Sequence, residues 1–188
     1  MAREVGRRLV HASGSVVPAL YAFDVLTRSQ FQAVLLAGAS LAVVLEVLRL
    51  VVGVEWPLFD RLTREYEQDN PAGYALYTVS GAAAGLLFPP PAAVPALFML
   101  TIGDPISGLL GAGELRRVKR SSVLAVMFAV CTLLALPFVP PAAAVAGGLA
   151  ATVADGVKPV VRGYVVDDNL TIPLVAGGVM TGVLWLLG

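Results

Sequence analysis

Long apolar stretches alternate with short polar ones along most of the chain, and polar residues gather where one apolar stretch gives way to the next. A membrane-spanning helix needs roughly 20 predominantly apolar residues. Against that length, the pattern predicts seven spans, at residues 9–26, 31–53, 74–90, 92–111, 122–138, 141–157 and 171–187. Several are short and rich in glycine, alanine and proline, so one or two could be half-helices, and six spans are the alternative. We therefore expect an all-α, polytopic transmembrane bundle that forms a single domain over residues 1–188.

The polar stretch between the second and third spans has a pattern of its own. In residues 55–70, apolar and aromatic side chains recur at helical spacing from Leu58 to Tyr66, with charged residues between them. This spacing is typical of an amphipathic helix that lies along the membrane surface. Arg64 falls on its charged face, where it either faces solvent or forms part of the rim of a functional site.

Composition agrees with a membrane protein. Of the 188 residues, 57% are hydrophobic and 14% are charged, and the mean hydropathy is +0.82. A soluble domain carries about 25% charged residues. The 13 basic and 13 acidic residues give a formal net charge of zero, so no net field favours a nucleic-acid partner.

Basic residues fall almost wholly on one side of the predicted bundle. With seven spans, 12 of the 13 lysines and arginines share the face that carries the N-terminus, and Arg28 alone lies opposite. An excess of lysine and arginine marks the cytoplasmic side of membrane proteins. The pattern therefore predicts a cytoplasmic N-terminus. Because the opposite face has only tight, proline-containing turns, it also predicts a functional site at the cytoplasmic face.

An acidic residue lies inside one of the apolar stretches, in the sequence TIGDPISGLLGAG at residues 101–113. A charged side chain at membrane depth costs roughly 2.5–3.5 kcal/mol on insertion scales, so Asp104 indicates a functional site, the alternative being a pair with a neighbouring helix. The glycines around it leave backbone N–H groups exposed and a basic cluster follows, which together favour phosphate binding. The residues expected to contact phosphate are Gly103, Gly108, Gly111, Arg116, Lys119 and Arg120.

Polar residues of the first two spans and the last two spans are further candidates. Glu46 and Arg49 can pair on one helix face, as a structural ion pair or as part of a site. His11, the single histidine, is either a hydrogen-bonded interior residue or a participant in chemistry. Near the cytoplasmic ends of the last two spans, the sequences Ala-Asp155-Gly and Asp-Asp168-Asn offer oxygen ligands for Mg²⁺, or else a hydrophilic turn with a helix cap.

Carboxylates, glycines and a basic cluster at one membrane face suit phosphoryl transfer from a nucleotide, in which positioning and charge neutralisation provide the catalysis. Neither GxxxxGK[ST] nor a kinase-type GxGxxG occurs in the chain. A nucleotide would therefore be bound by something other than the common soluble folds.

Five segments, in the order EVGRRLVHASG, EVLRL, TREYE, TIGDPISGLLG and DDNLTIPL, resemble the CTP-dependent lipid kinases. This family includes dolichol kinase, phytol kinase and yeast-type diacylglycerol kinase, and is related more distantly to phosphatidate cytidylyltransferases. The resemblance covers nearly the whole chain and implies transfer of the γ-phosphate of CTP, with Mg²⁺, to the terminal hydroxyl of an isoprenoid or glyceride lipid. The family motifs match Asp104, the group Arg7, Arg8 and His11, the pair Asp168 and Asn169, and the pair Glu46 and Arg49.

The resemblance also implies roles. Asp104, Asp155 and Asp168 are expected to hold Mg²⁺ on the β- and γ-phosphates. Cationic side chains are expected to neutralise the charge that develops on the phosphates. The residues expected to take part in chemistry besides Asp104 are His11, Glu46 and Arg49, and those expected to bind nucleotide include Arg64, Arg116, Lys119, Arg120 and Asn169. A polyprenol or dolichol that enters from the inner leaflet of a prokaryotic plasma membrane is the expected acceptor.

One element of the family differs here. The family has a Lys-Ser/Thr-x-Glu-Gly sequence after its GD motif, whereas this chain reads Lys119-Arg120-Ser121-Ser122-Val123-Leu124. Either the basic loop replaces that element, or donor handling differs. A cytidylyltransferase that makes a CDP-lipid, and a small ion-coupled transporter, are the alternatives to the kinase, and a purely structural membrane protein is the third.

Overall fold

The computed structural model describes residues 2–63, 67–111, 119–157, 160–161 and 164–188. In this part of the chain the fold is helical apart from one short β-ribbon, in which Val160–Val161 (β1) pairs antiparallel with Tyr164–Val165 (β2). The helices are α1 (Ala2–Ser13), α2 (Val16–Ala22), α3 (Arg28–Glu46), α4 (Pro57–Leu62), α5 (Gly73–Leu87), α6 (Pro90–Phe98), α7 (Asp104–Leu110), α8 (Ser121–Ala135), α9 (Pro141–Gly156) and α10 (Asp168–Leu187). Two π-helical segments, η1 (Val47–Val52) and η3 (Met99–Gly103), extend α3 and join α6 to α7. The predicted all-α class is confirmed.

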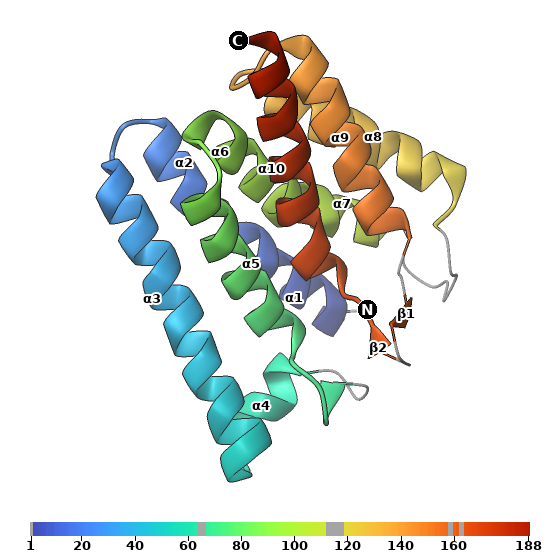
Figure 1. Ribbon diagram of the computed structural model, residues 1–188. Coiled ribbons are helices and arrows are strands. Elements are labelled where there is room, and N and C mark those ends of the chain that lie inside the picture. The colour runs from blue at the N-terminus through green and yellow to red at the C-terminus, as the bar shows by residue number, and fades with distance from the viewer. Residues whose placement is uncertain (1, 64–66, 112–118, 158–159, 162–163) are drawn as a thin grey trace.

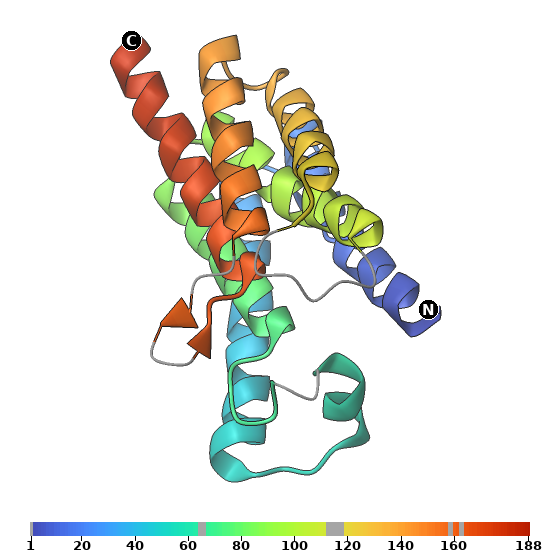
Figure 2. The ribbon, with the colours of Figure 1, turned by 90° about the vertical axis from the view of Figure 1, so that its right-hand side faces the viewer.

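Helix α10 runs through the middle of the bundle (Figure 1) and packs against α9, α5 and α6. Helix α8 packs on the outer side of α9, and α3 packs on α5 at the opposite edge. Helix α4 lies between α3 and α5 in the chain and sits beside the end of α3, at the end of the molecule where α5 begins (Figure 2). The first turn of α5 therefore faces the same end of the bundle as α4.

Among the described residues, three helices are long and apolar enough to cross a membrane: Arg28–Val52, Pro90–Leu110 and Asp168–Leu187. They fit a membrane protein. Only 11% of the apolar window of Arg28–Val52 is buried inside the protein, against 67% of that of Pro90–Leu110. The first is therefore a peripheral helix whose apolar side chains face outward, and the second is a core helix. The predicted count of seven spans stays a prediction.

Local sequence explains where five of the ten α-helices in the described part of the chain begin. Proline is the first residue of α4, α6 and α9, where its missing N–H and fixed φ match the first helical position. Thr27 starts α3 with a capping box: its hydroxyl accepts a hydrogen bond from Gln30 N, and the Gln30 side chain accepts one from Thr27 N. Asp167 caps α10 by accepting a hydrogen bond from Asn169 N at 2.9 Å.

The first predicted span, residues 9–26, is broken in two. Helix α1 begins at Ala2 and ends at Ser13, and α2 starts after Gly14 and Ser15. At the break the Tyr77 hydroxyl of α5 donates a hydrogen bond to His11 O at 3.3 Å, and a Cβ on Gly14 would collide with that hydroxyl. A glycine is needed here because the tyrosine from α5 occupies the space of a side chain.

The amphipathic helix predicted within residues 55–70 is shorter than the pattern indicated. Helix α4 ends at Leu62, where the Thr63 hydroxyl donates a hydrogen bond to Phe59 O at 2.8 Å. Residues 67–72 form a turn that leads into α5. The position predicted for Arg64 lies outside the described residues.

Candidate functional site

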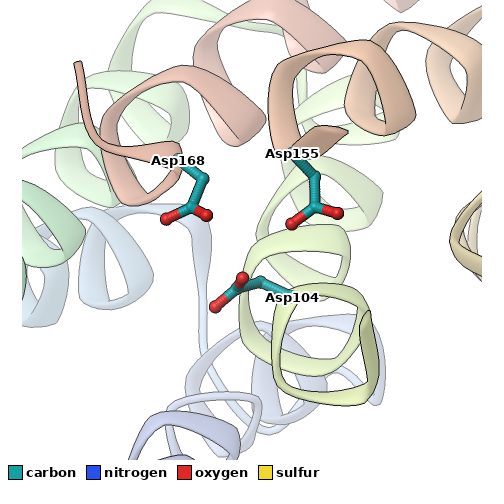
Figure 3. Close-up of side chains that lie close together, drawn as sticks. All are labelled: Asp104, Asp155 and Asp168. Atoms are coloured by element: carbon teal, nitrogen blue, oxygen red, sulfur yellow. The ribbon is translucent and has the colours of Figure 1, made fainter. Parts of the chain in front are cut away.

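Three carboxylates from different helices lie close together (Figure 3). They come from three elements: Asp104 begins α7, Asp155 lies in the last turn of α9, and Asp168 begins α10. One oxygen of each lies within 4.8 Å of one oxygen of the others. All three are buried, and Asp155 has no exposed surface. The structure therefore brings together the three residues that the sequence predicted as metal ligands.

The π-helical turn η3 sets the position of Asp104. A π-turn inside a helix often marks a functional site, because it inserts one extra residue into the helical register. Gly103, in this turn, packs against α8, where an added Cβ would lie 2.9 Å from Cys131 Sγ and 3.3 Å from Met127 Sδ. Gly103 therefore lets the core helix approach α8 closely. Its expected contact with phosphate stays a prediction.

Lys119 forms an ion pair with one of the three carboxylates, that of Asp155. Its Nζ donates hydrogen bonds to Asp155 Oδ1 at 2.6 Å and to Ser107 Oγ at 3.0 Å. The Ser107 hydroxyl in turn donates to Asp155 Oδ2 at 2.6 Å. Both oxygens of the fully buried Asp155 are thus engaged, and its charge has a cation beside it, as a buried charge requires.

Asn169 follows Asp168 and is buried, with 6% of its surface exposed. Its backbone carbonyl accepts a hydrogen bond from the Ser80 hydroxyl at 2.6 Å. Its side-chain Oδ1 is buried and has no hydrogen-bond partner among the described residues, although Asn169 lines a cleft. A buried amide oxygen without a partner costs about 1–3 kcal/mol, which a ligand in the cleft would recover.

His11 approaches the cluster from α1. Its Nδ1 lies 3.6 Å from Asp104 Oδ2, and its ring meets the ring of Tyr77 edge-on, with centroids 4.5 Å apart. The His11 ring therefore lies beside Asp104, and its Nε2 is buried without a hydrogen-bond partner among the described residues.

Arg8 extends from the same helix over α7. Gly108 carries no side chain at the point where the Arg8 guanidinium passes, and a Cβ there would collide with it. Gly111, one turn further along at the end of α7, has only an ordinary contact at that position, 3.4 Å from Ser107 O. The two predicted phosphate glycines therefore differ, since only Gly108 makes room for a cationic side chain.

A cleft of about 1100 Å³ opens beside these groups. Its walls are formed by α1, by α4 with the turn after it, and by α5, and its polar end reaches the acid cluster. Lining residues used below are Arg8, His11, Tyr74, Tyr77, Asp104 and Asn169. The cleft is large enough for a nucleotide or the head of a lipid.

Glu46 and Arg49 form a tether at the far end of α3. The Arg49 guanidinium donates to both oxygens of Glu46, at 3.1 and 2.6 Å, and to three backbone carbonyls of residues 67, 68 and 70. Glu46 also accepts from Ala72 N and from the Tyr74 hydroxyl. Tyr74 lines the cleft, whereas Glu46 and Arg49 are not among the described residues that line it. The pair fixes the turn before α5, and its predicted part in chemistry stays a prediction.

Arg116 and Arg120 are the remaining predicted residues, and Ser107 and Tyr77 were not predicted. Arg120 is exposed at the start of α8, and Arg116 lies outside the described residues. Sequence reasoning missed Ser107 and Tyr77. Ser107 could have been found because it lies three residues after Asp104 and so shares its helix face; nothing in the sequence indicates that Tyr77 meets His11.

No protein-family model, curated protein or solved structure matches this chain.

Proposed function

We propose that this protein is an integral membrane phosphotransferase that moves the γ-phosphate of CTP to the terminal hydroxyl of a membrane lipid alcohol, of polyprenol or dolichol type. The observation that carries the proposal is the convergence of Asp104, Asp155 and Asp168 from three helices, next to Lys119 and at the end of a cleft. Phosphoryl transfer depends on positioned groups and charge neutralisation, and this site offers both. The order of motifs along the chain supports the same assignment.

The donor set fits Mg²⁺. Mg²⁺ prefers hard oxygen ligands, which the three carboxylates can provide. When bound, the ion would neutralise charge on the β- and γ-phosphates. Asp104, Asp155 and Asp168 would hold it.

The residues of the chain have distinct tasks in the reaction. Arg8 and Lys119 place positive charge beside the phosphates. The lipid hydroxyl oxygen forms a bond to the γ-phosphorus as the bond from phosphorus to the β-phosphate oxygen breaks, and CDP leaves with that electron pair. A carboxylate of the acid cluster accepts the hydroxyl proton.

The proposed setting is a prokaryotic plasma membrane, with seven crossings, a cytoplasmic N-terminus and a site open to the cytoplasm. The distribution of basic residues supports this orientation, because 12 of the 13 fall on one face when the chain crosses seven times. CTP is a cytoplasmic metabolite, so the donor would reach the cleft from that side.

Phosphate transfer from γ-labelled CTP to polyprenols, dolichol, phytol-type alcohols and diacylglycerol, in the presence of Mg²⁺, tests the proposal. We expect Asp104→Asn to lower the rate by about 100-fold or more, because it removes a charged ligand of the Mg²⁺ ion that would neutralise the phosphates. The control is Asp24→Asn: Asp24 is exposed and has φ 57°, a backbone conformation that asparagine tolerates.

Equal activity in Asp104→Asn and Asp24→Asn would show that Asp104 takes no part in the reaction. Release of pyrophosphate with a phospholipid acceptor, without transfer of the γ-label, would instead assign cytidylyl transfer to the same residues.

A further inference from the structure

Tyr74 lines the cleft with its ring and not with its hydroxyl group. It is the second residue of α5, and its hydroxyl donates a hydrogen bond to Glu46 Oε1. Because neither Glu46 nor Arg49 is among the described residues that line the cleft, this hydroxyl is directed away from the cleft. The carbon atoms of the ring are therefore the part of Tyr74 that a bound molecule would contact.

The Tyr74 ring is held in position by groups outside the cleft. Glu46 accepts hydrogen bonds from the Tyr74 hydroxyl and from Ala72 N, so one carboxylate fixes both the ring and the turn before α5. Arg49 in turn holds this carboxylate with two hydrogen bonds, at 3.1 and 2.6 Å. A side chain whose orientation is already fixed loses little conformational entropy when a ligand packs against it. The ring is therefore a preorganised surface.

The surroundings of the ring favour a nucleoside over a hydrocarbon chain. Glu67 also lines the cleft, and its Oε1 accepts a hydrogen bond from Gly73 N, next to Tyr74, at 3.3 Å. Thr78 lines the cleft one helical turn after Tyr74, and Thr63 lines it from the end of α4. An isoprenoid chain has no polar group to match such a wall. A nucleoside joins hydroxyl groups to an aromatic base, and every base has a π-face that can stack on an aromatic side chain.

The opposite end of the cleft reaches the acid cluster, where the proposed function places the phosphates. Asp104 and Asn169 line that end. The two ends adjoin at the start of α5, because a Cβ on Gly73 would lie 3.2 Å from Asn169 Nδ2 and 3.4 Å from Glu67 Oε1. A nucleotide carries its phosphates at one end and its base at the other. With the phosphates at the cluster, the base extends along the cleft toward Tyr74.

We propose that the base of the donor nucleotide packs against the ring of Tyr74. This inference rests on the proposed function, which names CTP as the donor and places its phosphates at the acid cluster. It makes Tyr74 a nucleotide-binding residue, which the sequence did not indicate.

Equilibrium dialysis of labelled CTP against the purified protein, in detergent with Mg²⁺, tests this proposal. We expect Tyr74→Leu to raise the dissociation constant of CTP about tenfold or more, because stacking on the ring is lost. Tyr74→Phe keeps the ring and is expected to stay within about threefold of the wild type. The matched control is Phe23→Leu, since Phe23 is 80% exposed and is not among the described residues that line the cleft.

Two further measurements separate the ring from the fold. Inorganic tripolyphosphate, which has no base, is expected to compete with equal affinity in the wild type and in Tyr74→Leu. In the wild type, 5-iodo-CTP is expected to cross-link through its base to Tyr74 on irradiation, with the site identified by mass spectrometry. The cross-link needs no variant, so it decides the question even if Tyr74→Leu does not fold.

Unchanged CTP binding in Tyr74→Leu, an equal loss for CTP and tripolyphosphate, or a cross-link at another residue would overturn the proposal. A higher KM for the polyprenol alone in Tyr74→Leu would show that the ring packs against the lipid. Transfer of phosphate with a cross-link elsewhere would overturn this inference and leave the proposed function intact. CTP bound at Tyr74 without transfer would do the reverse, and a wild type that binds no CTP would overturn both.

Discussion

At the scale of single residues, a substitution at Gly108, beside the Arg8 guanidinium, is expected to lower activity without lowering stability. We expect Gly108→Ala to displace the Arg8 guanidinium and to lower kcat/KM for CTP by about tenfold, which corresponds to about 1.4 kcal/mol. Because alanine is the better helix former, by roughly 0.5–1 kcal/mol in a helix interior, the thermal stability of the variant is expected to stay the same or rise. Initial rates over a range of CTP concentrations, together with a thermal unfolding curve, give both quantities.

Gly111→Ala is the matched control, since it adds the same methyl group to the end of the same helix with only an ordinary contact. We expect its kcat/KM to stay within about threefold of the wild type. Similar losses in both variants would mean that a general effect on α7 is responsible and that Arg8 is not.

The three carboxylates of the acid cluster could be predicted from the sequence, whereas the bond between Lys119 and Asp155 could not. Carboxylates are rare in apolar stretches, so Asp104, Asp155 and Asp168 were found without knowledge of the fold. The bond from Lys119 to Asp155 joins residues whose proximity depends on the packing of α8 against α9. Lys119 was therefore expected to contact phosphate, because the sequence shows its charge but not its partner.

At the scale of elements, the ion pair at the end of α3 connects a peripheral helix to the rest of the molecule. The side chains of Glu46 and Arg49 are 11% and 8% exposed, so the pair is largely withdrawn from water. Removal of one partner of such a pair costs about 3–5 kcal/mol, because it leaves the other charge unpaired. We expect a loss of this size for Arg49→Ala, measured as a lower midpoint of thermal unfolding in detergent.

Arg28→Ala is the control for this prediction. Arg28 is exposed at the opposite end of the same helix, where substitution is expected to change the free energy of unfolding by less than about 0.5 kcal/mol. If the two variants unfolded at the same temperature, the tether would contribute nothing to stability.

Element positions follow from the apolar pattern where helices are long, and deviate where a distant side chain intervenes. The predicted spans at 31–53 and 171–187 differ little from Arg28–Val52 and Asp168–Leu187. The predicted span at 9–26 forms two helices, and at the break between them Tyr77 of α5 occupies the space beside Gly14. A hydrophobicity pattern carries no information about such an intrusion.

At the scale of the whole molecule, the proposed seven crossings require the two ends of the described chain to lie on opposite sides of the membrane. We expect a cysteine introduced by Gly188→Cys to react with an impermeant maleimide in intact cells, and one introduced by Ala2→Cys to react only after permeabilisation. Cys131 is the single native cysteine and is fully buried, so background labelling is expected to be low.

Labelling of both ends from the same side would show an even number of crossings. In that case the assignment of six spans would replace seven, and the side on which the cleft opens would have to be determined again.

The assembly of the acid cluster from separate helices has a consequence for how the protein is made. Ribosomes add roughly 5–20 residues per second, so several seconds separate the synthesis of Asp104 from that of Asp168. In the proposed topology, the helix Pro90–Leu110 enters the bilayer before α10, which carries Asp168, can pack against it, although it is the least apolar of the three long helices. Its carboxylate must therefore be carried into the membrane by its own apolar neighbours, or wait at the translocon. Insertion of this helix is then the step in biosynthesis at which a further polar substitution would do the most harm.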